Sequence, residues 1–210
     1  MTKSKKSSNL MTYAGTFGAL VILCVVLAIA SPNFFKYSNM MSILKQTSFN
    51  ALVSTGMLLC LITAGIDLSV GSNCVLCTCT IGVLVQNFGI TSMPLLIIAG
   101  LAVSTFAGFI DGTLLTRLDL PHPFVSTLGM KNVLWGLALV ITGSKSIAFT
   151  NTGVDNLMWI GGGSLFKTET FPGIPFSFIL VIIVFIIFDI FLRKTALGRQ
   201  IYCVGGNPEA

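Results

Sequence analysis

Charged residues are scarce in this sequence: Asp, Glu, Lys and Arg make up 9% of the 210 residues, whereas 54% are hydrophobic. A soluble globular domain carries about 25% charged residues, and the mean hydropathy of this chain is +0.92. This composition excludes a soluble enzyme and indicates that membrane lipid surrounds most of the chain. We therefore predict an all-α fold, a polytopic transmembrane helical bundle that forms one domain over residues 1–210.

The usual motifs of catalysis and cofactor binding are also missing. The sequence contains no Gly-x-x-x-x-Gly-Lys-Ser/Thr loop, no His-Glu-x-x-His helix, no Gly-x-Ser-x-Gly elbow and a single histidine, His122. We therefore predict no catalytic residue and no cofactor in this chain. Its basic residues form no stripe interleaved with aromatic residues, so nucleic acid is not an expected partner.

Three cysteines, Cys74, Cys77 and Cys79, have a spacing that superficially suits a metal site. They lie in an apolar stretch without a second cluster of ligands, and on a helix Cys79 would lie about 140° around from Cys74. We expect these thiols to pack against neighbouring helices, and we predict no metal site.

Hydrophobic stretches long enough to cross a membrane, which takes about 20 residues, recur along the chain. We predict about six spans, at 13–30, two within 46–86, then 93–115, 124–142 and 176–192. The more polar segments 31–45 and 143–175 between them are predicted to be outer loops.

The distribution of Lys and Arg predicts the orientation, because these residues are retained on the cytoplasmic side. Seven lie on one side of the six-span path and four on the other: Lys3, Lys5, Lys6, Arg117, Arg193, Lys194 and Arg199, against Lys36, Lys45, Lys145 and Lys167. We predict a cytoplasmic tail over 1–12. The segment Ala28-Ile29-Ala30 leaves a cleaved signal peptide as an alternative, but the long apolar stretch favours a retained helix.

The segment from Gly65 to Ser72 interrupts the second long apolar stretch and contains Asp67. A carboxylate in such surroundings must face a cavity, a partner or the membrane surface. Asp67 could cap the following helix, or it could line a path for a hydroxylated solute together with neighbouring Ser residues. Both roles remain open.

Asp111 and Lys131 are unexpected charges inside predicted spans. Asp111 lies about 9 Å from the inner end of its span and Lys131 about 12 Å from the inner end of the next. We hypothesise that they form an intramembrane ion pair, since each charge alone would be unfavourable there. The alternative is that each avoids lipid separately, by facing water or by extending towards the surface.

Four blocks of sequence resemble a known family. They are Ser31-Pro32-Asn33-Phe34, the region from Gln46-Thr47-Ser48 through Gly65-Ile66-Asp67-Leu68-Ser69-Val70-Gly71-Ser72, Pro123-Phe124-Val125-Ser126-Thr127-Leu128-Gly129-Met130, and Leu197-Gly198-Arg199 with Gly205-Gly206-Asn207. Together they resemble the permease subunits of bacterial ATP-binding-cassette (ABC) importers for monosaccharides, the ribose, xylose and galactoside class. The resemblance implies a location in the bacterial inner membrane, a homodimer of permeases, two ATPase subunits that bind ATP, and a periplasmic sugar-binding protein.

The same resemblance implies roles for particular residues. The expected pathway or gating residues are Asn50, Gly65, Asp67, Ser69, Gly71 and Thr127. The expected contacts with the ATPase are Arg199, Gly205, Gly206 and Asn207, in a coupling segment that begins within 193–210. The outer loop 143–175, with Lys145 and Lys167, is the expected surface for the binding protein.

Some features depart from the family pattern. Asp111 stands where the family usually has Asn, Trp135 precedes Gly136 where it usually has Arg, and the chain covers only about six spans of a ten-span permease. We therefore expect either a fragment of a working importer or a truncated, non-transporting permease. An ion-coupled secondary transporter that uses Asp67, Asp111 and Lys131 is the main alternative, an intramembrane enzyme is a weaker one, and the sequence does not specify the sugar.

Overall fold

The computed structural model describes residues 4–206 except 118–122, 150–151, 169–170 and 172, and for residues 4–12 it describes only the backbone. In this part of the chain the elements are α1 (Ser4–Ala30), α2 (Tyr37–Ile62), α3 (Val70–Phe88), α4 (Met93–Arg117), α5 (Pro123–Thr142), α6 (Asp155–Gly162), β1 (Ser164–Leu165), β2 (Ile174–Pro175), α7 (Phe176–Lys194) and α8 (Ala196–Gly206). The strands pair antiparallel and are two residues long each. The predicted all-α fold class is confirmed.

Most predicted spans agree with helices, but the predicted loop 31–45 is wrong in its second half. Pro32 ends α1, and the turn that follows is short, because α2 already begins at Tyr37. The polar residues from Ser38 to Lys45 therefore form the first turns of a helix. They can do so because α2 packs along α7 and beside β2.

In the described part of the chain, five helices are long and apolar enough to cross a membrane, whereas about six were predicted. They are α1, α3, α4, α5 and α7. The difference concerns α2. Its 26 residues form a helix about 39 Å long, but the first half of this helix carries Ser, Asn, Lys, Gln and Thr side chains.

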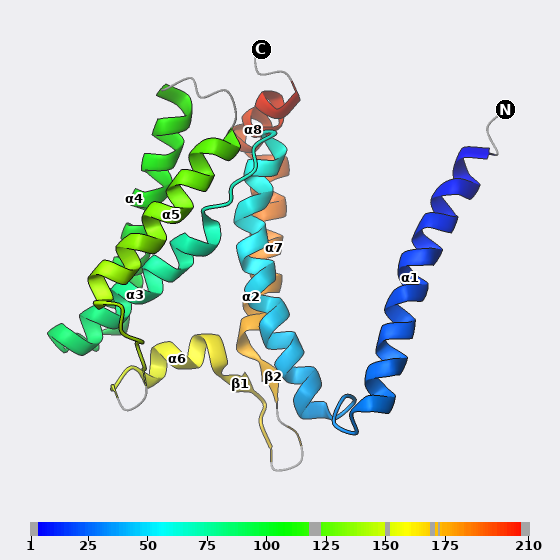
Figure 1. Ribbon diagram of the computed structural model, residues 1–210, viewed down its shortest axis with the longest axis horizontal. Helices are drawn as coiled ribbons and strands as arrows, with labels where there is room; N and C mark the ends of the chain where they lie inside the picture. Colours follow the sequence, from blue (N-terminus) through cyan, green and yellow to red (C-terminus); the bar gives the residue numbers. More distant parts are fainter. Residues whose placement is uncertain (1–3, 118–122, 150–151, 169–170, 172, 207–210) are drawn as a thin grey trace.

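Figure 1 shows two groups of helices side by side: α3, α4 and α5 in one, and α2 and α7 in the other. α8 and the loop between α2 and α3 lie at one end of the bundle, and α6 with the two strands lies at the opposite end. We call these the α8 end and the α6 end. Helix α1 also begins towards the α8 end.

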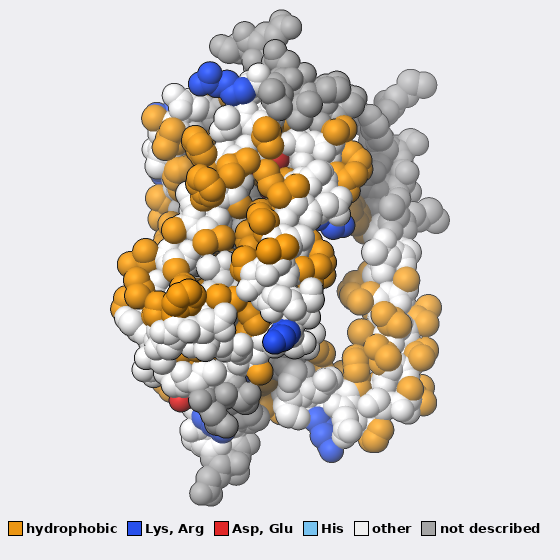
Figure 2. Space-filling model, turned by 60° about the vertical axis from the view of Figure 1, so that its left-hand side comes forward, with side chains coloured by type: hydrophobic (Ala, Val, Ile, Leu, Met, Phe, Trp, Pro, Cys, Tyr) orange, Lys and Arg blue, Asp and Glu red, His pale blue; other side chains and the backbone are white. Residues whose placement is uncertain are grey.

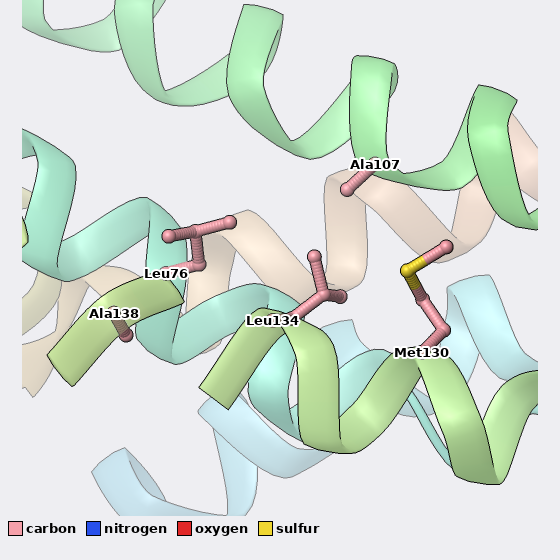
Figure 3. Close-up of a cluster of buried hydrophobic side chains, with 5 residues drawn as sticks. All are labelled: Leu76, Ala107, Met130, Leu134 and Ala138. Atoms are coloured by element: carbon pink, nitrogen blue, oxygen red, sulfur yellow. The ribbon is translucent and has the colours of Figure 1, made fainter. Parts of the chain in front are cut away.

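The buried core lies where α3, α4 and α5 meet (Figure 3). It consists of Leu76 from α3, Ala107 from α4, and Met130, Leu134 and Ala138 from α5. The three α5 residues are four apart, so they form one stripe on the helix that faces the other two. A second cluster of Val85, Leu96 and Val154 connects α3 and α4 to the start of α6.

Helix α1 stands apart from the rest of the molecule. None of the residues from Tyr13 to Ala30 is buried, and Figure 2 shows an open gap between this helix and the remainder. Hydrophobic side chains cover the viewed face of the other helices as well. Their exposure is the expected property of surfaces that meet lipid or other helices.

Candidate functional site

The loop between α2 and α3 is held in a defined shape at the α8 end. Helix α2 ends in a Schellman motif, in which the Gly65 amide donates to the Cys60 carbonyl at 2.8 Å and the Ala64 amide donates to the Leu61 carbonyl at 3.1 Å. Ala64 takes the left-handed conformation with φ of 59°, which glycine usually adopts. Glycine suits the next position, 65, because any other residue would place its Cβ only 3.3 Å from the Cys60 carbonyl oxygen.

Asp67 begins the approach to α3. Its carboxylate oxygen Oδ1 accepts a hydrogen bond from the Ser69 amide at 2.7 Å, so Asp67 forms a turn immediately before the helix. A negative charge at this position is favourable beside the amino-terminal end of α3. The N-cap residue of α3 is Ser69, and no side chain caps the helix. Asp67 therefore stabilises the turn before the helix instead of capping it, and its side chain also lines a cavity.

Two adjacent hydroxyl groups on α5 form hydrogen bonds, one to this loop and one to α4. The Thr127 hydroxyl donates to the Ile66 carbonyl at 3.0 Å, and the Ser126 hydroxyl donates to Asp111 Oδ1 at 2.7 Å. Ser126, Thr127 and Asp111 are all buried. The first turn of α5 therefore fixes the position of the 63–69 loop relative to α4.

The predicted ion pair between Asp111 and Lys131 is wrong. Among the described residues the only salt bridge joins Arg193 and Asp189, and the side chain of Lys131 is exposed. Neither depth nor direction matches, because Asp111 contacts Ser126, and Lys131 lies about 7.5 Å further along α5 and about 140° around it. The buried carboxylate is therefore stabilised by a hydroxyl instead of a cation.

A cavity of 260 Å³ lies against these groups at the α8 end. Its lining includes Gly65, Asp67 and Thr127 from the predicted pathway set, together with Asp111. Cys60 and Pro123 also line it and were not predicted. We call it the inner cavity; it offers two carboxylates and a threonine hydroxyl within a largely apolar wall, a combination that suits a small hydroxylated solute.

The other predicted pathway residues lie elsewhere. Asn50 and Gly71 line a separate cavity of 460 Å³ between α2 and α3, and Ser69 is buried without lining either cavity. The sequence thus identified residues of two distinct cavities as one set. Ser126 was missed, although its position beside Thr127 on the buried side of α5 was a usable signal.

Helix α8 packs closely against the end of α2. A Cβ at Gly205 would overlap the Ile62 carbonyl oxygen, whereas a Cβ at Gly206 would meet nothing within 4 Å. The start of α8 is equally close to α7, because a Cβ at Gly198 would overlap the Leu192 carbonyl oxygen near the end of that helix. Of the residues predicted to meet the ATPase, Arg199 is exposed, Gly205 faces α2, and Asn207 lies outside the described residues.

The outer loop predicted over 143–175 contains ordered structure. Lys45 Nζ donates to the Gly162 carbonyl at the end of α6, at 2.6 Å, where a cation is also favourable for the helix dipole. The rings of Trp159 and Phe176 lie 5.0 Å apart, and those of Tyr37 and Phe171 lie 5.1 Å apart. These contacts anchor α6 and the strands onto α2 and α7.

A known protein family matches most of this sequence. Residues 39–210 match the family described as "Branched-chain amino acid transport system / permease component". The chain belongs to this permease family.

Several named relatives of this permease are sugar importers. The chain is 33% identical over 202 residues to the ribose import permease protein RbsC of Bacillus subtilis (strain 168), covering 96% of this chain and 60% of that protein. It is 36% identical over 197 residues to the ribose import permease protein RbsC of Escherichia coli (strain K12), covering 91% and 57%, and 33% identical over 216 residues to the fructose import permease protein FruF of Bifidobacterium longum (strain NCC 2705), covering 99% and 58%.

The chain thus spans between 57% and 60% of the length of these relatives. No solved structure matches it.

Proposed function

We propose that this permease is the membrane-spanning part of an ABC importer that carries a monosaccharide into a bacterial cell. The observation that supports this most directly is the similarity to ribose and fructose import permeases over 91% to 99% of the chain. The family description mentions amino acids, but these named relatives carry sugars. The inner cavity, with its carboxylates and hydroxyl, is chemically suited to such a solute.

In this proposal the permease makes and breaks no covalent bond. A partner ATPase subunit binds and hydrolyses ATP, and its differential contacts shift the permease between two states. A second copy of the permease completes the pathway, and a periplasmic protein delivers the sugar. The α8 end faces the cytoplasm in the inner membrane, as the excess of Lys and Arg on that side supports.

The direct test is uptake of labelled D-ribose and D-fructose by cells that carry the gene with its ATPase and binding-protein partners, compared with cells from which the gene is deleted. We expect saturable uptake that disappears when cellular ATP is depleted. A proton ionophore applied while ATP is maintained should leave uptake unchanged. Uptake that follows the ion gradient would instead support an ion-coupled carrier, and absence of uptake for both sugars would count against the proposal.

Helix α8 is the proposed contact with the ATPase, through its exposed side chains. Arg199→Glu reverses a charge on that surface, so we expect the variant to be as abundant as the wild type but to co-purify with much less ATPase. Arg117→Glu makes the same change on an exposed residue at the end of α4 and is the matched control. If both variants co-purify with equally reduced amounts of ATPase, the reduction reflects charge reversal in general and not a specific contact at Arg199.

The α6 end is the proposed docking surface for the binding protein. Lys167 is exposed there, and Lys167→Glu is expected to lower uptake at limiting binding protein while permease abundance stays constant. Lys36→Glu, an exposed lysine beside the α1–α2 turn, serves as the comparison. Unchanged uptake in Lys167→Glu would remove this surface from the proposal.

A further inference from the structure

Helix α8 approaches the rest of the bundle most closely near its two ends. A Cβ at Gly198, near its start, would overlap the Leu192 carbonyl oxygen of α7. A Cβ at Gly205, near its end, would overlap the Ile62 carbonyl oxygen of α2. Each of these backbone approaches therefore requires a residue without a side chain.

The part of α8 between these two glycines borders open space. A cavity of 610 Å³ lies where α2, α7 and α8 meet, and its lining includes Thr55 and Leu58 of α2, Phe188 and Arg193 of α7, and Tyr202 of α8. Tyr202 is 51% exposed, so this part of α8 is not held by close packing. A displacement of α8 therefore reaches the other helices mainly through Gly198 and Gly205.

The contact at Gly205 lies directly beside the inner cavity. Ile62 is the last residue of α2, and the next residue, Thr63, lines the inner cavity. A Cβ at position 205 would lie 3.5 Å from the Cα of Thr63. The contact at Gly198 differs, because it meets α7, and among the described residues none from α7 lines this cavity.

The loop 63–69 is braced on both sides, so a displacement at its start is passed on. The Ala64 and Gly65 amides donate to carbonyl groups in the last turn of α2. On the other side, the Thr127 hydroxyl of α5 donates to the Ile66 carbonyl at 3.0 Å. Coupling between distant parts of a protein is carried by such chains of hydrogen bonds and close contacts. The loop therefore connects α8 to the wall of the inner cavity and to α5.

We propose that Gly205 is a positioning residue, which transmits a displacement of α8 to the loop 63–69 and so changes the shape of the inner cavity. A methyl group at position 205 would force α8 away from Ile62 and interrupt this transmission. The competing route runs through Gly198 and along α7. The inference rests on the proposed function, in which the ATPase contacts α8, and deepens it by naming the contact through which movement of α8 reaches the cavity.

Gly205→Ala and Gly206→Ala form a matched pair. Both add one methyl group to the same turn of α8, but only the methyl group at position 205 meets another segment. In the permease alone, we expect faster amide hydrogen exchange over the loop 63–69 in Gly205→Ala and unchanged exchange there in Gly206→Ala. Exchange over α5 should stay unchanged in both, which shows that the variants are folded. Equal exchange over the loop in the two variants would overturn the proposal.

Cys60 lines the inner cavity and reports on its shape in the complete importer. A parent protein that carries Ala at the other five cysteines keeps it as the single thiol. Its rate of labelling by a methanethiosulfonate, which depends on access to the thiolate, is measured with the ATPase and binding protein bound, without nucleotide and with ATP and vanadate. We expect ATP and vanadate to change this rate several-fold in the parent and in Gly206→Ala, and to have little effect in Gly205→Ala at equal amounts of bound ATPase. A full response in Gly205→Ala would favour the route along α7 and overturn the proposal.

The ratio of ATP hydrolysed to sugar taken up separates lost transmission from a general structural defect. A structural defect lowers both activities together, whereas lost transmission lowers only the uptake of D-ribose or D-fructose. We therefore expect Gly205→Ala to hydrolyse several-fold more ATP per sugar than Gly206→Ala, and equal ratios would overturn the proposal.

A measurement on the unmodified importer covers the case in which Gly205→Ala does not fold. Hydrogen exchange is then compared with and without ATP and vanadate, and we expect changes over 196–206 to be accompanied by changes over 63–69. A change over 196–206 alone would overturn the proposal. Exchange in the permease alone requires neither ATPase nor sugar, so failure of the proposed function appears separately, as absent uptake by the unmodified protein.

Discussion

The two ends of the bundle are held together in different ways. At the α8 end the contacts are short polar bonds made by buried side chains, such as Thr127 to Ile66 and Ser126 to Asp111. At the α6 end a lysine and aromatic rings join segments far apart in the chain, such as Lys45 to Gly162. Buried polar bonds are directional and intolerant of loss, whereas exposed aromatic contacts tolerate small displacements. The α8 end should therefore be the more rigid of the two.

The largest effect is expected from Ser126→Ala. This change leaves the Asp111 carboxylate, 8% exposed, without its hydroxyl donor, which should lower the free energy of unfolding by about 2–3 kcal/mol. Thermal unfolding in detergent measures the change. Ser42→Ala removes an exposed hydroxyl that bonds only to the Ser38 carbonyl of its own helix and should change little. Equal losses in the two variants would mean that water replaces the hydroxyl at Asp111.

A smaller effect is expected from Thr127→Val, which keeps the shape of the side chain and removes its bond to Ile66. We expect a loss of about 1 kcal/mol in the free energy of unfolding and faster amide hydrogen exchange in the loop 63–69. Thr113→Val removes a hydroxyl that bonds to the Phe109 carbonyl on its own helix, so exchange in this loop should stay unchanged. If both variants exchange alike, Thr127 does not hold the loop.

The smallest effect is expected at the α6 end from Lys45→Met. The ammonium group donates to Gly162, but it is partly exposed and water can replace it, so the expected loss is about 0.5 kcal/mol. Lys36→Met removes an exposed lysine without that bond and is the control. If Lys45→Met lowers the free energy of unfolding as much as Ser126→Ala does, the difference proposed between the two ends is contradicted.

The sequence predicted the membrane helices well, because hydrophobic length alone determines them. The start of α7 at Phe176 and the break between α2 and α3 were both visible in the sequence. The start of α2 could not be predicted from the sequence. The polar residues from Ser38 to Lys45 are typical of a loop, and they form a helix because they pack against distant parts of the chain. Helix α6 and the two strands were likewise not predicted, because they depend on long-range contacts.

The candidate site was predicted in part. Asp67 and Thr127, both predicted as pathway residues, line one cavity, while Asn50 lines another. The pairing of Asp111 with Lys131 failed because the shift of one helix along another, and the direction in which a side chain points, both depend on how the helices pack.

The pairing of α2 with α7 constrains the order in which the protein can assemble. Helices α3, α4 and α5 contact one another as successive segments, so they can close as they leave the ribosome and enter the membrane. Helix α2 enters before them, yet its partner begins only at Phe176. It must therefore remain without that partner while the intervening chain is synthesised, and long-range pairings of this kind form slowly. During synthesis the polar half of α2 would then be the segment most in need of protection by the insertion machinery.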